Sequence, residues 1–527
     1  MKTASTLAIL LASASFAFAA GPNDSFIGQF GAFNGAIVGQ VDGHNTQNTI
    51  QGGVGNAAIT SQSGAGTTGS NDSDTLQFGG GNSAFIAQKT GTNAQTTLQV
   101  GAANAAVVGQ VNGKKNNSSI AQFGVANGAV IGQNAGSNSQ GVLQVGALNS
   151  AIVSQANGSL PGGNVSTTLQ FGIGNGAIVG QDGGNNSQTT LQTGVGNFAL
   201  TSQAGARSGR TNASDTVQFG FGNVSIAGQT GGNNSQGTFQ FGARNAALTS
   251  QASNRYGQTN GSTTLQFGRG NGSTVLQASA ASGGANTSAV LQAGNGNNAL
   301  VGQSSAGGFI SSGADNDQTT LQFGNRNNAL VGQNGAGGFL VAGADNNQTT
   351  LQVGNDNTAI TTQSGSSLAS TLLGGAAANN SFTLQFGDDN FSVASQTNGL
   401  NEQATLQVGK RNSAITGQAN GATSANLNGA VTAQFGVENV ALTSQSIANP
   451  LSAGANASGI VQTGYQNVAV AYQATGPQSM IGSNIQGTFQ VGAGNYAVTS
   501  QATGANVSNT SVTAQFGYRN VAVTSQR

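Results

Sequence analysis

The chain has 527 residues, of which 85 are glycine and only 5% are charged. Its 14 basic and 14 acidic side chains give a formal net charge of zero, so composition argues against a nucleic-acid partner or an anionic membrane surface. Cysteine is absent, which excludes disulfides, thiolate metal sites and thiol catalysis. Because 36% of the residues are hydrophobic and no net charge keeps copies of the chain apart, we expect self-association.

The N-terminus has the features of an export signal. Lys2 precedes an apolar run from about Leu7 to Phe18, and residues 17–19 have the small-x-small pattern of a signal-peptidase site. The run is shorter than the roughly 20 apolar residues that a membrane-spanning helix needs, and no later segment approaches that length. We predict that residues 1–20 are a signal peptide that is removed and that the mature chain is secreted. An apolar first strand or a membrane anchor is the alternative.

A tandem repeat organises the remaining chain. The pattern Q-x-G-x2-N-x-[AS]-x3-Q occurs in twenty consecutive copies, the first at residues 29–40 and the last at residues 515–526. The closest copies start 22 residues apart, and longer spacings insert residues after the final Gln of a copy. We therefore predict a single β-solenoid over residues 21–527 with variable loops on one edge, such as 306–317 and 336–347.

Each repeat has the pattern of strand, turn and strand. In residues 167–181, Thr-Thr-Leu-Gln-Phe is followed by Gly-Ile-Gly-Asn and then by Gly-Ala-Ile-Val-Gly-Gln. Two short runs of strand-forming residues flank a glycine-rich turn, and neither run has a helical period. The Asn after the turn can adopt a left-handed backbone or bond to a neighbouring backbone group, and glycine supplies any other positive φ.

A single hairpin-sized unit cannot bury a face, so we expect the repeats to stack. The predicted fold is all-β: a β-solenoid of about twenty strand-turn-strand rungs in cross-β geometry, with two parallel sheets. At roughly 4.8 Å per rung, each repeated amide can donate to one neighbour and accept from the other. This ladder role is predicted for Gln29, Asn34, Gln40, Gln77, Asn82, Gln88, Gln170, Asn175, Gln181, Gln266, Asn271, Gln277, Gln322, Asn327, Gln333, Gln407, Asn412, Gln418, Gln515, Asn520 and Gln526. The turn glycines of the same rungs are Gly31, Gly79, Gly172, Gly268, Gly324, Gly409 and Gly517.

Alternation along the strands places the motif residues on one face and residues such as Leu169 and Phe171 on the other. Hydrophobicity alone would bury the second face. Its volume varies widely between copies, as shown by one equivalent position occupied by Phe30, Gly52, Val100, Thr193 and Ala293. Because a close-packed interior tolerates volume changes poorly, we predict that the nearly uniform motif face lies inside.

These residues resemble the repeat of the curlin family, and copies such as Gln-Phe-Gly-Gly-Gly-Asn-Ser-Ala at 77–84 are close to it. The resemblance covers about residues 25–527. It implies a secreted subunit that polymerises outside the cell into curli-like amyloid fibres of a biofilm matrix, acting in adhesion and aggregation. The implied partners are further copies of the chain, a nucleator subunit, an outer-membrane secretion pore and accessory chaperones. Familiar curlins have fewer repeats and a targeting segment before the first one, so the export route and the choice between major subunit and nucleator stay open.

The sequence contains no recognisable catalytic or metal-binding pattern, and we predict neither enzymatic activity nor a cofactor. His44 is the only histidine and is expected in a loop. The acid pairs 72/74, 315/317 and 388/389 are expected in loops or at turns, without a nearby base or an EF-hand register. The glycines of residues 172–176 join two strands and therefore lack the helix dipole of a phosphate loop.

Two other functions fit a solenoid. A monomeric surface adhesin would need capped ends, and only Arg527 follows the last repeat. An ice-binding protein would need a flat Thr-x-Thr array, whereas Thr167 and Thr168 are adjacent and therefore point to opposite faces. The fibre subunit is the preferred interpretation.

Overall fold

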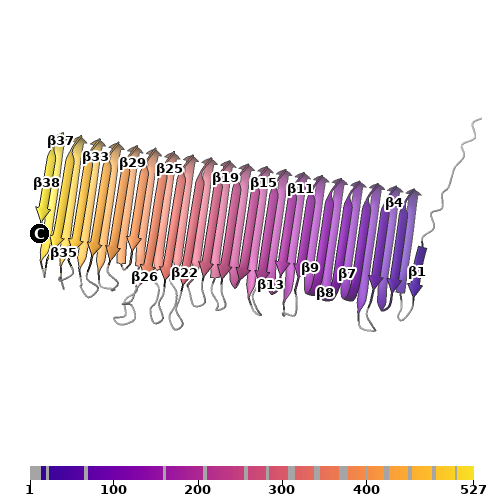
Figure 1. Ribbon diagram of the computed structural model, residues 1–527. Helices are drawn as coiled ribbons and strands as arrows, with labels where there is room; N and C mark the ends of the chain where they lie inside the picture. The colour runs from indigo at the N-terminus through magenta and orange to yellow at the C-terminus, as the bar shows by residue number, and fades with distance from the viewer. Residues whose placement is uncertain are drawn as a thin grey trace, which may run out of the picture. The chain divides into compact units, whose positions relative to one another are not determined.

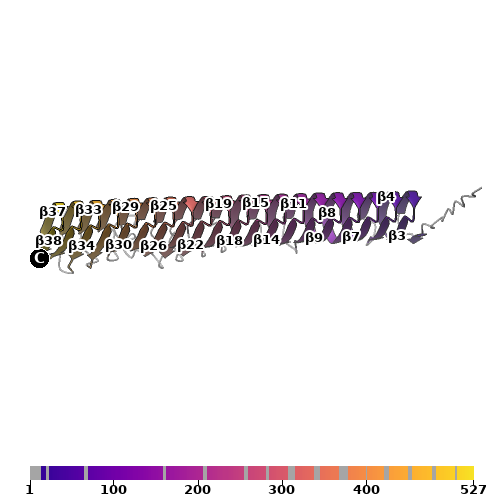
Figure 2. The same cartoon turned by 90° about the horizontal axis from the view of Figure 1, so that it is seen from above.

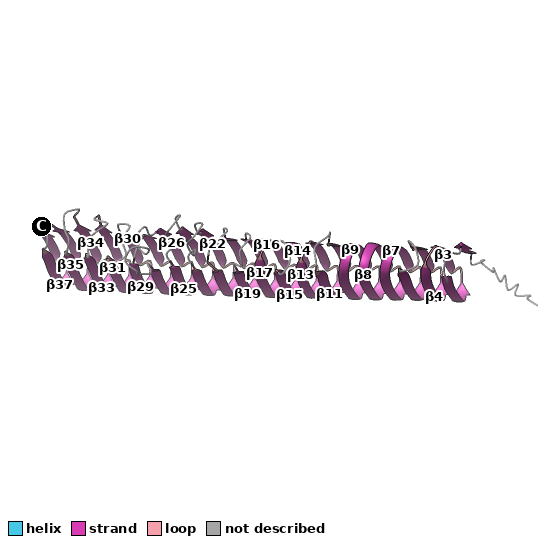
Figure 3. Cartoon of the chain, turned by 90° about the horizontal axis from the view of Figure 1, so that it is seen from below, coloured by secondary structure: helices cyan, strands magenta, loops and turns pink. Residues whose placement is uncertain are grey.

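The computed structural model describes residues 14–18, 23–64, 69–157, 162–205, 210–253, 259–279, 284–306, 315–336, 345–366, 378–398, 400–420, 426–448, 454–476, 482–504 and 507–527. Over these ranges the regular structure consists of β-strands without a helix (Figure 3). The strands pair in parallel between successive repeats, which makes the fold a parallel β-solenoid. The predicted fold class is confirmed.

The chain divides into two compact units, coloured from indigo to yellow along the sequence in Figure 1. Unit 1 comprises residues 1–231 and 237–243, and unit 2 comprises residues 232–236 and 244–527. The strands of unit 1 are β1 (Ala14–Phe18), β2 (Asn23–Ala32), β3 (Gly35–Val41), β4 (His44–Val54), β5 (Ala57–Ser63), β6 (Ser70–Gly80), β7 (Ser83–Ala102), β8 (Ala105–Val125), β9 (Gly128–Ala147), β10 (Ser150–Ala156), β11 (Gly163–Ile173), β12 (Gly176–Asp182), β13 (Asn185–Val195), β14 (Phe198–Gly205), β15 (Thr211–Phe221) and β16 (Val224–Gly231).

The boundary between the units falls within β17 (Asn233–Ala243), and the following strands belong to unit 2. They are β18 (Ala246–Ser253), β19 (Thr259–Arg269), β20 (Gly272–Ser279), β21 (Asn286–Asn295), β22 (Asn298–Ala306), β23 (Asn316–Asn325), β24 (Asn328–Ala336), β25 (Asp345–Asn355), β26 (Thr358–Ser366), β27 (Ala378–Asp388), β28 (Phe391–Thr397), β29 (Leu400–Lys410), β30 (Ser413–Asn420), β31 (Leu427–Val437), β32 (Val440–Ile447), β33 (Ala455–Tyr465), β34 (Val468–Thr475), β35 (Ser483–Ala493), β36 (Tyr496–Thr503), β37 (Ser508–Tyr518) and β38 (Val521–Gln526).

Each repeat contributes one rung, made of a first arm, a turn and a second arm. Within each unit, first arms pair with first arms and second arms with second arms, so that the arms form two layers (Figure 2). In unit 1, Gln170 of β11 lies against Gln192 of β13. In unit 2, Gln322 of β23 lies against Gln352 of β25. The sequence repeat therefore sets the register of both layers.

In β7, β8 and β9 the backbone continues as a strand through the corner between two rungs. Strand β7 has 20 residues and contains the second arm of one repeat and the first arm of the next. Thr90 and Gly91, with φ of 53° and 99°, turn the chain within it. The neighbouring repeat is one residue longer, and the pairing of β7 with β8 absorbs this residue as a register shift between Gly91 and Asn93.

The turn between the two arms has its left-handed residue immediately before the motif Asn. Gly174 occupies this position with φ of 65°, and Arg326 occupies it in unit 2 with φ of 54°. Asn175 itself does not have a positive φ; its side chain bonds to neighbouring backbone oxygens. Of the two predicted roles for this Asn, the left-handed one is wrong and the hydrogen-bonding one is confirmed.

The turn glycine of the motif is required by the stacking of the rungs. Gly172 has φ of 120°, which side-chain-bearing residues rarely adopt. A Cβ atom on Gly172 would overlap the carbonyl oxygen of Gly194 in the next rung. The same overlap recurs at the turn glycines predicted from the sequence, except Gly517 in the last rung. Two adjacent backbones thus approach more closely here than any side chain would allow.

The interior of the solenoid contains the motif face, as predicted. Gln170 and Thr168 are fully buried, as are Ala177, the motif alanine of this rung, and Val179 two positions further on. The more apolar face points outward, and Phe78 is 40% exposed. Hydrophobicity alone would have inverted the fold, whereas uniformity of side-chain volume identified the inside correctly.

Two predictions, the signal peptide and the inserted loops, fall largely outside the described residues. Of the predicted signal peptide, the structure describes Ala14–Phe18, which form β1 and pair in parallel with β3. Removal of residues 1–20 stays a prediction. Most of the expected inserted loops, including 307–314 and 337–344, are not among the described residues. The single solenoid over residues 21–527 also stays a prediction.

Replacing Gly172 by Ala should destabilise its rung strongly. The new Cβ overlaps the backbone of Gly194 and the residue must keep φ near 120°, so we expect a loss of roughly 3 kcal/mol. Amide hydrogen exchange should accelerate in β11 and β13. Gly174→Ala is the matched control, because its φ is 65° and no atom lies within 4 Å of an added Cβ. Equal exchange in the two variants would contradict the requirement for close backbone approach.

Candidate functional site

Two glutamine ladders run through the interior, one along each layer. Gln170 Nε2 donates to Gln192 Oε1 at 2.9 Å, and Gln170 Oε1 accepts from Gln144 at 2.8 Å. In the other layer, Gln181 Nε2 donates to Gln203 Oε1 at 2.8 Å. The same bond to the next rung is made by the predicted residues Gln29, Gln40, Gln77, Gln88, Gln266, Gln277, Gln322, Gln333, Gln407 and Gln418. Within each unit every internal rung repeats one hydrogen-bonding pattern.

The glutamines also close the rung from inside by binding backbone oxygens. Gln170 Nε2 lies 3.0 Å from Ser150 O and 3.1 Å from Asn175 O, both in second arms or turns. Gln181 Nε2 lies 3.0 Å from Val165 O in the first arm. Each ladder therefore connects its own layer along the stack and also connects the two layers to each other.

The asparagine after the turn forms a third ladder. Asn175 Nδ2 donates to Asn149 Oδ1 and to Gly194 O, both at 3.1 Å, and its backbone N–H donates to Asn149 Oδ1 as well. Asn175 Oδ1 in turn accepts from both donors of Asn197. Equivalent bonds hold the predicted residues Asn34, Asn82, Asn271, Asn327, Asn412 and Asn520. This ladder satisfies the backbone of the turn at every rung.

A fourth ladder was missed in the sequence. Asn164, at the start of the first arm, accepts from Asn186 Nδ2 at 2.9 Å and donates to Asn138. Asn186 Nδ2 also binds the carbonyl of Gly183 at the corner. An Asn stands six residues before the first motif Gln in all twenty copies, so the complete pattern is N-x5-Q-x-G-x2-N-x-[AS]-x3-Q. The signal is present in the sequence, six residues before the first Gln of the repeat pattern.

The glutamine ladders and the asparagine ladders donate hydrogen bonds in opposite directions along the stack. The two glutamine ladders donate toward the higher-numbered rung, as Gln29 does to Gln51. The two asparagine ladders donate toward the lower-numbered rung, as Asn56 does to Asn34. Two amide dipoles per rung therefore point along the stack in each direction. Within each ladder, all amides donate in the same direction along the stack. Because the two kinds of ladder donate in opposite directions, their side-chain dipoles largely cancel.

Between the ladders, side-chain shape matters more than hydrogen bonding. One buried row of the first arms holds Thr75, Ile120, Val142 and Thr168 at equivalent positions. The hydroxyls of Thr75 and Thr168 have no hydrogen-bond partner among the described residues. A β-branched side chain is common to the row, whereas an amide is common to each ladder. This difference explains why the ladder positions are invariant between repeats and this row is not.

Charged residues gather at the turns of unit 2. Arg326 donates from Nε and Nη2 to Asp356, both at 2.6 Å, and this hydrogen bonding lowers the pKa of Asp356. Glu438 accepts from Gln466 and pairs with Arg411, and the bond from Gln466 is the main cause of its lowered pKa. These pairs are exposed, so each contributes little to stability. Each pair joins a basic and an acidic side chain from the turns of two adjacent rungs.

The acid pairs lie on strands or at their ends. Asp72 and Asp74 lie on strand β6, not in a loop as expected, because outward strand positions tolerate polar residues. Asp317 likewise belongs to β23, and His44 is the exposed first residue of β4. Burial, and secondarily the charge of Asp74, raises the pKa of Asp72. The described residues contain no group of three His, Asp or Glu placed to hold a metal ion.

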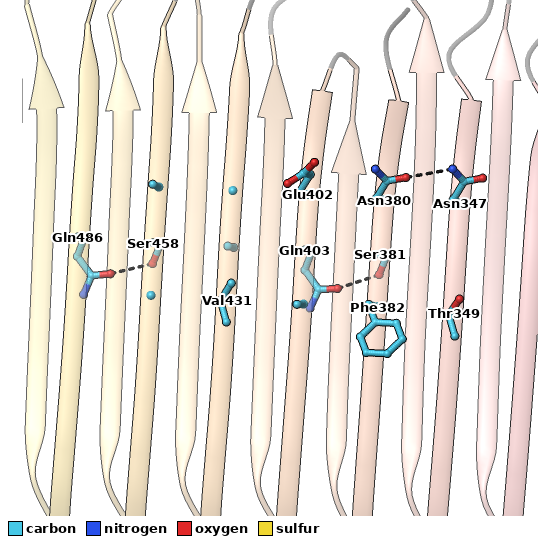
Figure 4. Close-up of a pocket in the computed structure, with 15 residues that line it drawn as sticks. Asn347, Thr349, Asn380, Ser381, Phe382, Glu402, Gln403, Val431, Ser458 and Gln486 are labelled. Carbon is cyan, nitrogen blue, oxygen red and sulfur yellow. Dashed lines mark hydrogen bonds between the residues drawn. The ribbon is translucent and has the colours of Figure 1, made fainter.

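A shallow hollow lies on the outward face of the first arms in unit 2, over β25 to β35 (Figure 4). Its volume is about 650 Å³, and it exists because Gly429, Ala457 and Gly459 are small beside Phe382 and Val431. Three pairs of its polar lining residues are bonded to each other: Asn347 to Asn380, Ser381 to Gln403 and Ser458 to Gln486. The hollow interrupts the apolar outward rows.

The outward threonines do not form a flat array. Thr168 is buried, while Thr167 and Thr189 point outward at adjacent rungs and are followed by Asp215. As expected from their spacing, neighbouring threonines of one strand lie on opposite faces. The geometry of unit 1 does not support ice binding by this row.

Fold and interior together define the class of this protein: a parallel β-solenoid with tandem repeats and buried Asn and Gln ladders. In comparisons with known proteins, no family model matches the chain and no curated protein shows significant similarity to it. None of the described segments forms a helix long and apolar enough to span a membrane. The curlin resemblance therefore depends on the repeat pattern and on the ladders.

Replacing Gln170 by Glu should destabilise the chain in a pH-dependent way. Burial raises the pKa of a carboxyl group in the folded state, so stability should fall as pH rises above the unfolded value of about 4.3. We expect a loss of roughly 3 kcal/mol at pH 7 relative to pH 3, measured as the free energy of unfolding in guanidinium.

Thr167→Asp is the matched control for this experiment. Position 167 is outward, its register partners Gly141 and Thr189 are uncharged, and the chain has Asp215 at the equivalent position two rungs further on. The stability of the control should vary little between pH 3 and pH 7. A similar pH dependence in both variants would show that the glutamine ladder does not require neutral amides.

Proposed function

We propose that this chain is a secreted structural protein that self-assembles into extracellular amyloid fibres, as the resemblance to curlin repeats implies. Adhesion, aggregation and a contribution to a biofilm matrix are the functions that such fibres would serve. The observation that carries the proposal is the chemical complementarity between the first and last rungs of the chain. Fibre growth would continue, between copies, the ladders found inside each unit.

The last rung presents donors and acceptors that match those of the first. Gln515 and Gln526 accept from the preceding rung, and their Nε2 atoms donate only to the backbone oxygens of Tyr496 and Thr510. In the first rung, the Oε1 atoms of Gln29 and Gln40 accept no hydrogen bond from any described residue. Strand β1, which pairs with β3 beside Gln40, lies within the predicted signal peptide, so its removal would open this edge. The asparagine ladder has the opposite direction: Asn520 Oδ1 in the last rung accepts no hydrogen bond from any described residue and could accept one from the first rung of another copy. A second copy could supply all of these partners at once.

Apolar side chains at the two end rungs are also exposed. Phe516 is 67% exposed and Phe30 is 69% exposed, although the equivalent residues inside each unit are covered on both sides by neighbouring rungs. Phe489 and Phe516 lie with ring centroids 5.6 Å apart, which shows that outward aromatic rings on adjacent rungs contact each other. Stacking another copy would therefore bury apolar area in addition to completing the ladders.

The resemblance also supplies the remaining parts of the proposal. We expect the mature chain outside the cell, on fibres attached to the cell surface. Its partners would be further copies of itself, a nucleator subunit, an outer-membrane pore and accessory chaperones. A structural role without enzymatic activity or a cofactor is consistent with an interior made of amides that bond to one another.

Fibre diffraction tests the proposal directly. The purified chain lacking residues 1–20 should form unbranched fibrils near neutral pH, with a meridional reflection at about 4.7–4.8 Å. Electron microscopy supplies the morphology, and the same sample supplies the diffraction. A chain that stays soluble at high concentration, without this reflection, would reject the fibre function.

Gly517→Ala should block one end of the fibre. In the last rung no atom lies closer than 3.8 Å to an added Cβ, so the variant has no clash within its own chain. In a fibre this Cβ would overlap the backbone of the next copy, as a Cβ on Gly172 or Gly492 would overlap the next rung within the chain. The variant should add to a wild-type fibre and then stop growth at that end. Seeded elongation at equal concentration should fall at least tenfold for the pure variant.

The control is Gly270→Ala, an internal turn position with φ of 67° and no atom within 4 Å of the new Cβ. It should elongate at the wild-type rate. Imaging of single fibres should show that a small fraction of Gly517→Ala in wild-type protein arrests one end only. Unchanged two-ended growth would contradict assembly by head-to-tail stacking.

A further inference from the structure

The outward face of the second arms in unit 1 alternates between large and small side chains. We call its central row the ridge and the rows on either side of it the furrows. The ridge consists of Ile37, Ile59, Phe85, Val107, Val130, Ile152 and Ile178, which are between 36% and 55% exposed. The furrow before the ridge consists of Gly35, Ala57, Ser83, Ala105, Gly128, Ser150 and Gly176. The furrow after it consists of Gly39, Ser61, Ala87, Gly109, Gly132, Ser154 and Gly180.

Neither the backbone conformation nor the packing within the chain requires glycine in the second furrow. Gly39, Gly109, Gly132 and Gly180 have ordinary strand φ values, in contrast to the turn glycines. No atom lies within 4 Å of a Cβ added to any of the four. Glycine weakens a strand relative to a residue with a side chain, and in strands it often marks close approach of another backbone. The space above these glycines is therefore available to a molecule outside the chain.

The pattern is confined to these seven rungs. In the next two rungs of unit 1, the row before the ridge carries Phe198 and Val224. In unit 2 this row mixes small residues such as Gly272 with Phe391, Val440 and Tyr496. In the row after the ridge, Gly302 and Gly332 of unit 2 lie on adjacent rungs but are flanked by Leu276 and Thr362. Since both units share the interior pattern, the furrows of unit 1 do not follow from the solenoid fold.

We propose that the furrowed face of unit 1 is an interface between two copies of this chain. A twofold axis parallel to the direction of stacking keeps the rungs of the two copies level and reverses the strand direction. It can seat each ridge in the second furrow of the partner, at the roughly 10 Å separation of face-to-face sheets. The ridge and the second furrow are complementary in shape and carry no charged residue that pairing would leave buried. Lys89 and Asp182 lie in the next outward row, at the edge of the paired area.

The area of this face suits a specific interface. Seven rungs at about 4.8 Å and three outward positions at about 7 Å span roughly 34 Å by 20 Å. Pairing would thus bury on the order of 700 Å² on each copy, close to the roughly 800 Å² per partner of stable protein interfaces. Pairing runs sideways to the stack and does not rest on the proposed growth of fibres from the end rungs.

Filling the second furrow tests the inference. The combined variant Gly109→Thr, Gly132→Thr and Gly180→Thr adds side chains where the chain leaves open space, and threonine favours strands. Its thermal stability should therefore equal or exceed that of the wild type. Sedimentation velocity of the full chain should show dimers for the wild type and monomers for the variant. In fibres, scanning transmission electron microscopy should show a twofold lower mass per unit length for the variant.

Two matched controls place a threonine at open glycines elsewhere. Gly141→Thr lies on the first-arm face of unit 1, and Gly417→Thr lies on the second-arm face of unit 2. Both should keep the dimer and the wild-type mass per unit length. Equal values for the wild type and the furrow variant, or equal losses in the controls, would overturn the inference. If no fibres form, the fibre function fails and sedimentation alone still decides the pairing.

Discussion

A buried primary amide in this protein finds its ladder partners one rung away, above and below. Each net hydrogen bond contributes only about 1 kcal/mol, but an unsatisfied buried amide costs roughly 1–3 kcal/mol. Gln170 illustrates the consequence, since its oxygen and nitrogen bind Gln144 and Gln192 in the two adjacent rungs. A rung shifted by one residue would leave all of its amides without partners. The ladders therefore specify register as well as stabilise the stack.

The turn glycines impose the same spacing from the backbone. Gly172 and Gly194 approach so closely that no Cβ fits between them, which keeps Asn175 within reach of Gly194 O. The asparagine ladder depends on this approach, and the glutamine ladders depend on the register that the asparagines hold. An interior of hydrogen-bonded polar side chains therefore restricts which residues can lie next to each other as strongly as a close-packed apolar interior does.

The outside of the solenoid is free of these constraints and differs between the units. Unit 1 presents a ridge between furrows on its second arms, while unit 2 presents bulkier rows there and paired charges at its turns. Outward residues contact neighbouring rungs along their own rows and, as Phe489 and Phe516 do, between adjacent rows. Specificity toward other copies or surfaces must therefore come from the outward rows, while self-assembly along the stack comes from the inside.

The sequence by itself determined the fold class, the strand-turn-strand repeat, the inward motif face and three of the four ladders. Periodicity suffices for these features because every rung must satisfy the same buried amides, and the same residues therefore recur in all twenty copies. The fourth ladder, at positions such as Asn164, was equally periodic and was missed only because the motif was read from its first glutamine.

Other features were decided by the tertiary structure. Gly172 and Gly180 look alike in the sequence, yet the first is forced by the carbonyl oxygen of Gly194 and the second faces open space. Asp72 was expected in a loop and lies on a strand, since a strand with one solvated face accepts a carboxylate on that face. The residue with the left-handed backbone is the one before the motif Asn, because the Asn side chain is needed for its ladder. Such distinctions depend on which atoms lie one rung away, and sequence spacing does not contain those distances.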